Sequence, residues 1–292
     1  MTMQTSTWRL GDLTVNRIGF GAMRLTGRAA FGAAASRDRD GAIAVLRRAI
    51  ELGVDHIDTA AFYFSGELAA NELIRQALAP YPDVLVIATK VWPGRDASGE
   101  WHWATPEQLR GQVEDNLRGL GRDHLDVVNL RVPPSLRGGS IAEHFTALAE
   151  LRDAGLVRHL GVSNVTLEQL TQAQSIAPVV CVQNAFGLGA PARERELLRV
   201  CGERGIAFVP FFAIAGSGRE SGAAASEHES VLAVARAHGV SPAQVRLAWT
   251  LRQGPHVLAI PGTGDLAHLA ENVAAADLRL TDDETDRLQA LS

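Results

Sequence analysis

The chain is poor in cysteine, carries no surplus of positive charge and contains no long apolar run. Its two cysteines, Cys181 and Cys201, cannot form a disulfide framework. A formal net charge of -5 provides no basic surface for nucleic acid or acidic lipid. No run approaches the roughly 20 apolar residues that span a bilayer, and the N-terminus lacks the layout of a secretory signal. We therefore expect a cytoplasmic protein, monomeric or weakly oligomeric, that acts on a small molecule and binds neither nucleic acid nor membranes.

Short β-rich runs alternate with helical segments along the chain. The runs lie at 16–21, 56–60, 84–90, 125–132, 157–164, 180–186, 206–213 and 256–262. Between them apolar residues recur at helical spacing, and Thr105-Pro106 and Ser241-Pro242 mark helix starts. A chain of 292 residues could form two ordinary domains or one large barrel. Eight strand-then-helix units without a long linker predict an α/β fold, a single (β/α)8 TIM barrel over residues 1–292.

The N-terminal region supports this architecture. Gly11-Asp12 marks the turn of a β-hairpin, which we expect to close the bottom of the barrel. The main rival fold, an open doubly wound sheet, would place a glycine-rich fingerprint near its first strand. The segment GFGAM at 19–23 matches that fingerprint poorly, so the barrel is favoured.

Polar residues follow several of the predicted strands. In a barrel the active site lies where the strands end, so such residues share one rim. Asp58 and Tyr63 follow the second run, Lys90 ends the third and Arg131 ends the fourth. The pairs Ser163-Asn164 and Gln183-Asn184 follow the fifth and sixth runs. Any one of them alone would be interpreted as a capping or solvated loop residue, but together they predict a functional site.

The sequence resembles the aldo-keto reductase family. The motifs IDTAAFY, ATK, GVSN, VQNAF, and IPGT followed by HLAEN occur in the order and with the spacing of that family, over nearly the whole chain. Within the family, VVNLRV, VPFF and IPGT are most similar to a bacterial branch of oxidoreductases that includes pyridoxal reductases of the pyridoxine 4-dehydrogenase type. The resemblance implies reduction of an aldehyde or ketone to an alcohol, with NADPH as cofactor and NADH as the alternative.

Carbonyl reduction defines what the site must contain. Hydride delivery builds negative charge on the carbonyl oxygen, so a proton donor and a fixed positive charge are needed beside it. The resemblance implies Tyr63 as the donor and Lys90 as the ammonium that stabilises its phenolate and lowers its pKa. Asp58 would pair with Lys90, orient it and reduce the cost of burying its charge.

Arg131 departs from the family pattern. Most aldo-keto reductases have a histidine five residues after the strand-four aspartate, which is Asp126 here. His124 lies before the strand and is expected at the surface. Arginine stays cationic and presents several donors in a planar fork. Arg131 is therefore expected in the catalytic set, where it would bind the carbonyl oxygen, clamp an anionic substituent of the substrate, or pair with an acidic neighbour.

The resemblance also implies a cofactor site. Ser163, Asn164 and Gln183 would hydrogen-bond the nicotinamide carboxamide, and Phe186 would take the place of a stacking tyrosine. The segment from strand eight into the next helix would hold a phosphate on backbone N–H groups. Gly262 and His268 stand where many relatives have lysine and arginine for the 2'-phosphate. The full expected set is Gly21, Met23, Arg24, Asp58, Ser163, Asn164, Gln183, Phe186, Phe211, Phe212, Ala213, Ala215, Gly216, Pro261, Gly262, Thr263, His268, Glu271 and Asn272.

The loops after the third and seventh strands complete the expected site. Phe64, Trp92, Trp101 and Trp103 could form an aromatic substrate cleft, although loop tryptophans often only pack a loop onto the barrel. Ala215 and Gly216, with Arg219 near them, would cover the pyrophosphate. The histidines show no metal-ligand spacing, so no metal is predicted. The alternative function is a cofactor-binding, catalytically weak regulatory or redox-sensing protein, because fold does not fix function.

Overall fold

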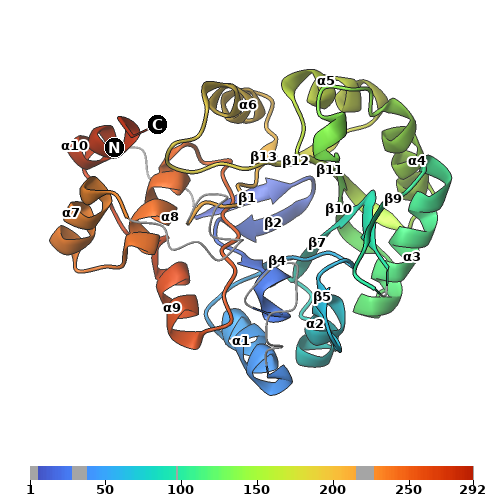
Figure 1. Cartoon of the computed structure of the whole chain (residues 1–292), viewed down its shortest axis with the longest axis horizontal. Coiled ribbons are helices and arrows are strands. Elements are labelled where there is room, and N and C mark those ends of the chain that lie inside the picture. Colours follow the sequence, from blue (N-terminus) through green and yellow to red (C-terminus); the bar gives the residue numbers. More distant parts are fainter. Residues whose placement is uncertain (1–5, 28–37, 97, 215–226, 292) are drawn as a thin grey trace.

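The protein was analysed as a computed structural model, which describes residues 6–27, 38–96, 98–214 and 227–291. Seven parallel strands form one curled sheet in the order β13-β12-β11-β10-β7-β4-β3 (Figure 1). Their bounds are β3 Phe20–Gly21, β4 His56–Asp58, β7 Val86–Val91, β10 Leu125–Arg131, β11 Val157–Ser163, β12 Val179–Gln183 and β13 Ala207–Phe208. This order follows the sequence from edge to edge, as the predicted succession of strand-then-helix units requires.

The segment 257–259, which follows the last of the seven strands in the sequence, closes the sheet into a barrel. Parallel bridges join Val257 to Phe208 on one side and Ala259 to Ile18 on the other. The predicted eighth strand is therefore present as a bridging segment, and the first and seventh strands are shorter than predicted. Pro210 has no N–H to donate and interrupts the pairing of the seventh run. The predicted (β/α)8 architecture is thus confirmed, with corrections to the strand lengths.

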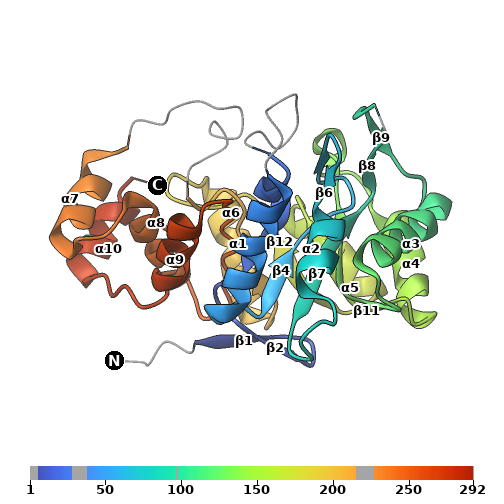
Figure 2. The ribbon, with the colours of Figure 1, turned by 90° about the horizontal axis from the view of Figure 1, so that it is seen from below.

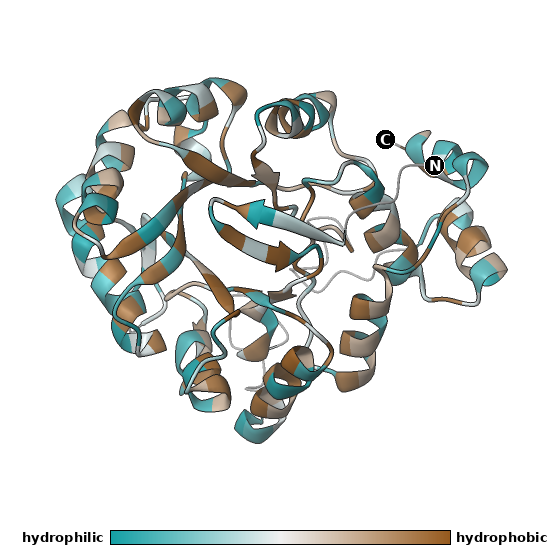
Figure 3. Ribbon diagram, turned by 180° about the vertical axis from the view of Figure 1, so that it is seen from behind, coloured by the Kyte–Doolittle hydropathy of each residue, from teal (hydrophilic) through white to brown (hydrophobic). Residues whose placement is uncertain are grey.

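The helices surround the barrel. They are α1 Arg39–Glu51, α2 Ala70–Leu78, α3 Leu109–Leu120, α4 Ala142–Asp153, α5 Leu167–Ile176, α6 Ala192–Glu203, α7 Glu229–His238, α8 Pro242–Arg252, α9 Leu266–Ala274 and α10 Asp282–Gln289. Ser241 begins α8, and Thr105 begins the short helix η2 Pro106–Gln108 that leads into α3, both as capping boxes and both as predicted. Figure 3 shows apolar strands and helices whose outer faces are largely polar. In the part of the chain that the structure describes, no helix is both long and apolar enough to cross a membrane.

A β-hairpin lies across one end of the barrel, as Figures 2 and 3 show. Its strands are β1 Thr7–Leu10 and β2 Leu13–Asn16, with the predicted turn at Gly11-Asp12. The side chains of Leu10 and Val15 are buried in a cluster with residues from β7, β10, β12 and β13. Asp12 forms an ion pair with Arg158 at 2.6 Å and a hydrogen bond with His159 at 2.5 Å. The hairpin therefore closes the N-terminal end of the barrel and leaves the opposite end for a site.

Short elements extend from that opposite end, where the parallel strands finish (Figure 2). The small hairpins are β5 Phe64–Ser65 with β6 Leu68–Ala69, and β8 Pro93–Arg95 with β9 Trp101–Trp103. The single turns are η1 Ala22–Leu25 and η3 Pro134–Leu136. Among the residues that the sequence assigns to the site, these elements carry or flank Gly21, Met23, Arg24, Tyr63, Phe64, Trp92, Trp101 and Trp103.

Candidate active site

Asp58 and Lys90 form a buried ion pair at the ends of two adjacent strands. Asp58 ends β4, and Lys90 lies near the end of β7, which pairs with β4 in parallel. The Lys90 Nζ atom lies 2.6 Å from Asp58 Oδ2 and donates a second hydrogen bond to the Thr59 carbonyl at 2.9 Å. Lys90 is 2% exposed and Asp58 5% exposed. Because water is excluded here, the attraction between the two charges offsets the cost of removing each of them from water.

Tyr63 lies beside this pair. Its side chain is buried, and the Lys90 Nζ atom is 4.9 Å from the centre of its ring. Burial raises the pKa of the Tyr63 phenol above its ordinary 10.0, while the charges of Lys90 and Arg131 act to lower it. The ammonium of Lys90 therefore lowers the pKa of Tyr63 as predicted, but loss of hydration outweighs it. The phenol consequently carries its proton at neutral pH, as a proton donor must.

Arg95 holds the backbone on both sides of Tyr63. Its Nη1 atom donates to the carbonyl of Phe64 at 2.9 Å and to that of Phe62 at 3.4 Å. Its guanidinium carbon also lies 4.5 Å from the centre of the Phe64 ring. No motif in the sequence marks this residue. Its position in the loop after the third strand was the available signal, but a loop arginine is ordinarily a solvated one.

Gln183 extends the charge network to a further strand. Its Nε2 atom donates to Asp58 Oδ1 at 2.7 Å, so both oxygens of that carboxylate are engaged. The Gln183 Oε1 atom is buried and has no hydrogen-bond partner among the described residues. A buried amide oxygen without a donor is costly, and a ligand N–H group would satisfy it. The Gln183 oxygen is therefore an atom that could hold an amide group of a cofactor.

Arg131 reaches the same rim from β10. Its Nη1 atom donates to Ser163 Oγ at 3.2 Å, and its guanidinium carbon lies 5.1 Å from the centre of the Phe211 ring. No carboxylate in the described ranges lies within ion-pair distance of it, which removes support from the predicted acidic partner. Asn164 follows Ser163 in a left-handed conformation, with φ of 59°, and its Nδ2 donates to the Val132 carbonyl at 2.8 Å.

Phe186 and Phe211 occupy different environments. Phe186 is 3% exposed, packs edge-on against Phe208 and lies parallel to Trp249 of α8 at 6.0 Å. Its ring therefore belongs to the layer between barrel and helices, and the predicted stacking role of Phe186 is wrong. Phe211 is the aromatic residue beside Arg131 at the mouth. Its neighbour Phe212 contacts it edge-on at 4.7 Å, and Ala213 is buried.

The segment between Ala259 and α9 differs from the expected phosphate site in one respect. The side chain of Asp265 already accepts hydrogen bonds from the backbone N–H groups of Ala267 and His268, at 2.8 and 3.0 Å. This segment was expected to hold a phosphate on backbone N–H groups, and two such groups at the start of α9 are bound to an anionic side chain instead. The His268 side chain is 68% exposed and its Nδ1 lies 4.0 Å from Asp265 Oδ1.

The remaining cofactor candidates that the structure describes are buried or partly buried. Gly21 and Gly262 bring their backbones together: a Cβ on either would lie 2.6 Å from a carbonyl oxygen of the other segment. Asn272 and Pro261 are buried, whereas Met23, Arg24, Thr263 and Glu271 are partly buried. Ala215, Gly216 and Arg219 lie outside the described residues.

The predicted substrate tryptophans separate into two groups. Trp92 is 2% exposed and stacks on His144 of α4 at 3.9 Å, so it packs the loop onto the barrel and the cleft role predicted for it is wrong. Trp101 and Trp103 are 42% and 47% exposed on β9 and stack at 6.3 Å. Trp101 also contacts Phe62, next to Tyr63, at 5.4 Å. His124 is half exposed, as predicted.

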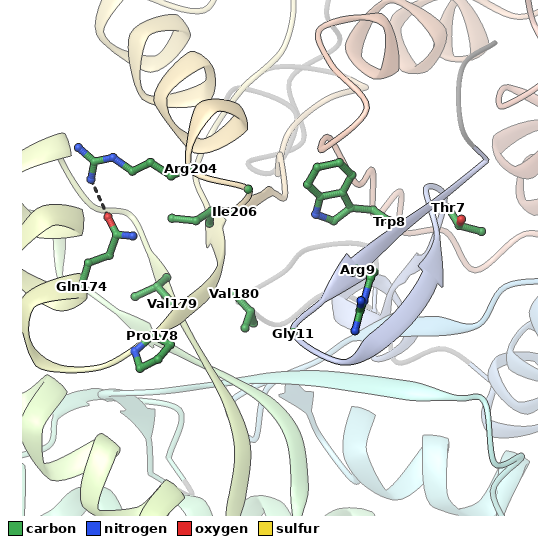
Figure 4. Close-up of a pocket in the computed structure, with 11 residues that line it drawn as sticks. Thr7, Trp8, Arg9, Gly11, Gln174, Pro178, Val179, Val180, Arg204 and Ile206 are labelled. Atoms are coloured by element: carbon green, nitrogen blue, oxygen red, sulfur yellow. Dashed lines mark hydrogen bonds between the residues drawn. The ribbon is translucent and has the colours of Figure 1, made fainter. Parts of the chain in front are cut away.

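A separate pocket of about 660 Å³ lies at the hairpin end of the barrel (Figure 4). Trp8, Arg9 and Arg204 are among its lining residues, and Arg204 donates to Gln174 Oε1 at 2.6 Å. None of the predicted site residues lines it. The concentration of charged and polar groups at the opposite rim therefore identifies the candidate active site.

Comparison with known proteins agrees with this geometry. The model of the Aldo/keto reductase family matches residues 17–292. Pyridoxine 4-dehydrogenase of Escherichia coli (strain K12) is 44% identical over 99% of both chains. An uncharacterised oxidoreductase of Schizosaccharomyces pombe is 38% identical over 95% of this chain and 87% of its own.

Solved structures give the same result. A thermostable aldo-keto reductase crystallised with the inhibitor epalrestat superposes with a TM-score of 0.81, at 28% identity over 100% of both chains. An aldo/keto reductase from Klebsiella pneumoniae in complex with NADP and acetate has a TM-score of 0.78, at 29% identity over 98% of this chain and 95% of its own. The fold and rim thus define a barrel oxidoreductase. The chain belongs to the aldo/keto reductase family, whose enzymes are NAD(P)H-dependent oxidoreductases, and the resemblance found in the motifs is confirmed.

Proposed function

We propose that the protein reduces an aldehyde or ketone to an alcohol, with NADPH as its cofactor and Tyr63 as the proton donor. The observation that carries this proposal is the buried arrangement of Lys90, with its Nζ 2.6 Å from Asp58 and 4.9 Å from the Tyr63 ring centre. A protonated phenol beside a fixed ammonium is what a carbonyl oxygen needs as it gains negative charge. The similar Klebsiella pneumoniae reductase, which was crystallised in complex with NADP, supports the cofactor.

The cofactor fits residues of this chain. The unpartnered Oε1 of Gln183 would accept from the nicotinamide carboxamide, and Ser163 and Asn164 stand on the neighbouring strand end. Phe211, beside Arg131, offers the aromatic face that Phe186 does not. A bound reduced nicotinamide would supply a hydride to the carbonyl carbon.

The chain's own groups then handle the proton and the charge. The Tyr63 hydroxyl donates its proton to the carbonyl oxygen, and Lys90 stabilises the phenolate that remains. Asp58 binds Lys90 through Oδ2 and Gln183 through Oδ1. The lysine beside the proton donor and the glutamine that would hold the nicotinamide are thus bound to one carboxylate. Arg131, whose charge acts on the Tyr63 phenol, would add the permanent positive charge of a guanidinium beside the same oxygen.

We further propose a planar heteroaromatic aldehyde such as pyridoxal as the substrate. The relative named pyridoxine 4-dehydrogenase supports this choice, since oxidation of that alcohol is the reverse of aldehyde reduction. The exposed rings of Trp101 and Trp103 beside the Tyr63 loop offer stacking surface for such a molecule.

A substrate panel tests the function. The purified protein is supplied with NADPH and with pyridoxal, benzaldehydes, short aliphatic aldehydes and sugar aldehydes, and NADPH oxidation is followed. We expect turnover with aromatic aldehydes and the highest kcat/KM for pyridoxal. NADPH binding without reduction of any carbonyl would instead support a regulatory or redox-sensing protein.

A further inference from the structure

A chain of buried hydrogen bonds lies behind the catalytic strands. The Thr59 hydroxyl donates to Asn71 Oδ1 at 2.8 Å, and Asn71 Nδ2 donates to Asn116 Oδ1 at 3.0 Å. The Thr89 hydroxyl donates to the same Asn116 oxygen at 2.6 Å. All four side chains are at most 4% exposed. Thr59, directly after β4, and Thr89 of β7 are therefore joined through asparagines on α2 and α3.

Each threonine is the chain neighbour of a catalytic residue. Thr59 follows Asp58, and its carbonyl accepts from Lys90 Nζ; Thr89 precedes Lys90. Successive side chains of a strand point to opposite faces, so the catalytic side chains face the barrel interior while the threonines face the helices. Thr59 follows the end of β4, and its backbone N–H still donates to the Ala88 carbonyl of β7 at 2.8 Å. The side-chain hydrogen bond to Asn71 adds a second constraint on that residue.

The same network reaches Tyr63 through the start of α2. The backbone N–H of Ala70, the first residue of α2, donates to the Tyr63 carbonyl at 2.9 Å. Asn71 is the next residue, so α2 contacts both the Tyr63 loop and Thr59. Gly119 of α3 lets the two helices approach, since a Cβ there would lie 3.1 Å from the Asn71 Cβ.

The hydrogen-bonding groups of this network are satisfied. Asn116 Nδ2 donates to the Gln112 carbonyl at 2.9 Å, and no atom of the four side chains is among the buried atoms without a partner. A buried network with all its hydrogen bonds formed fixes the orientation of its side chains, because hydrogen bonds are directional. Apolar side chains of similar volume would pack together without fixing that orientation.

We propose that Asn71 and Asn116 are positioning residues, which hold Thr59 and Thr89 and thereby set the relative placement of Asp58, Tyr63 and Lys90. This inference rests on the proposed function for its catalytic meaning. Misplacement of a catalytic group by about 1 Å can cost on the order of 100-fold in rate, so a small shift at either threonine is measurable.

Conservative threonine variants test the proposal, because they are less disruptive than changes at the asparagines. Thr89→Val keeps the shape and removes the hydroxyl, and Thr89→Ser restores a hydroxyl. Thr250→Val is the matched control: Thr250 is also fully buried, and its hydroxyl donates to the Arg246 carbonyl within α8, away from the site. We expect Thr89→Val to lower kcat by about 10- to 100-fold with unchanged NADPH Kd. Thr89→Ser should recover most of that loss, and Thr250→Val should keep wild-type kcat.

A second readout needs neither cofactor nor substrate. Lys90 is the only lysine in the sequence, so isotope-labelled lysine gives a single side-chain ammonium resonance. That resonance should shift in Thr89→Val and in Asn116→Leu and stay in place in Thr250→Val, with folding of each variant checked by thermal melting. An unmoved Lys90 resonance in a folded Thr89→Val protein would overturn the proposal, as would unchanged kcat or a failure of Thr89→Ser to recover. A wild-type protein inactive on every carbonyl would instead refute the proposed function, and the Lys90 resonance would still decide the positioning.

Discussion

Gln183 donates its side-chain N–H to Asp58 Oδ1 at 2.7 Å, while Lys90 occupies the other oxygen of the same carboxylate. One buried carboxylate thus orients both the ammonium beside the proposed proton donor and the amide proposed to hold the nicotinamide. A change at Asp58 is therefore expected to affect chemistry and cofactor binding together.

The charge pair can be tested by removing its members singly and together. Lys90→Met or Asp58→Asn alone leaves an uncompensated buried charge, and we expect each to lower the free energy of unfolding by about 3–5 kcal/mol. The double variant removes both charges, so its loss in free energy of unfolding should be smaller than the sum of the two single losses. Urea unfolding at neutral pH measures all three. Additive effects would show that the two charges do not interact.

The role of Arg131 is separated by substrate charge. If its guanidinium faces the carbonyl oxygen, as we propose, Arg131→Met should lower kcat/KM for neutral and anionic aldehydes alike. If it clamps an anionic substituent, only substrates with carboxylate or phosphate should show a KM raised by about 10- to 100-fold. Arg204→Met, at the hairpin end of the barrel, is the control. Wild-type kinetics with every aldehyde would exclude both roles.

The cap of α9 is expected to affect the choice of cofactor. The Asp265 carboxylate occupies the helix N-terminus where a 2'-phosphate was expected, and it would repel that dianion. We expect the wild type to bind NADPH only modestly better than NADH. Asp265→Asn keeps a capping oxygen and removes the charge, so it should tighten NADPH by a few-fold without changing NADH. Fluorescence titration measures both Kd values, and equal gains for the two cofactors would contradict this assignment.

The contacts of Asp12, in the turn of the β1–β2 hairpin, with Arg158 and His159 predict that stability depends on pH. Hydrogen bonds from Arg158 and His159 hold the pKa of Asp12 well below its ordinary 3.8. A carboxyl with a lowered folded pKa stabilises the fold above its unfolded pKa and loses that contribution as pH falls through the folded value. Asp12→Asn should therefore melt slightly lower than the wild type at neutral pH, and the difference should shrink below about pH 3.8. A difference in melting temperature that is independent of pH would contradict a stabilising role of the Asp12 charge.

The sequence predicted the barrel and the polar residues at its strand ends because both depend on order along the chain. Asp58, Lys90 and Arg131 come together since parallel strands end at one rim. Phe186 and Phe211 could not be distinguished in this way, because both follow strands and the alternation of faces depends on the local register. The Asp265 cap had a readable signal, an aspartate directly before an apolar helical pattern. Asn71 and Asn116 had none, since their contact depends on how closely α2 and α3 approach.

The central claim is that Tyr63 supplies the proton. Its direct test is single-turnover oxidation of bound NADPH by pyridoxal or another aldehyde that the wild type reduces, compared between the wild type and Tyr63→Phe. The account predicts wild-type NADPH Kd for the variant and a rate lower by about 10²- to 10⁴-fold, the scale of a lost general acid. A Tyr63→Phe protein that reduces the aldehyde at the wild-type rate would contradict it.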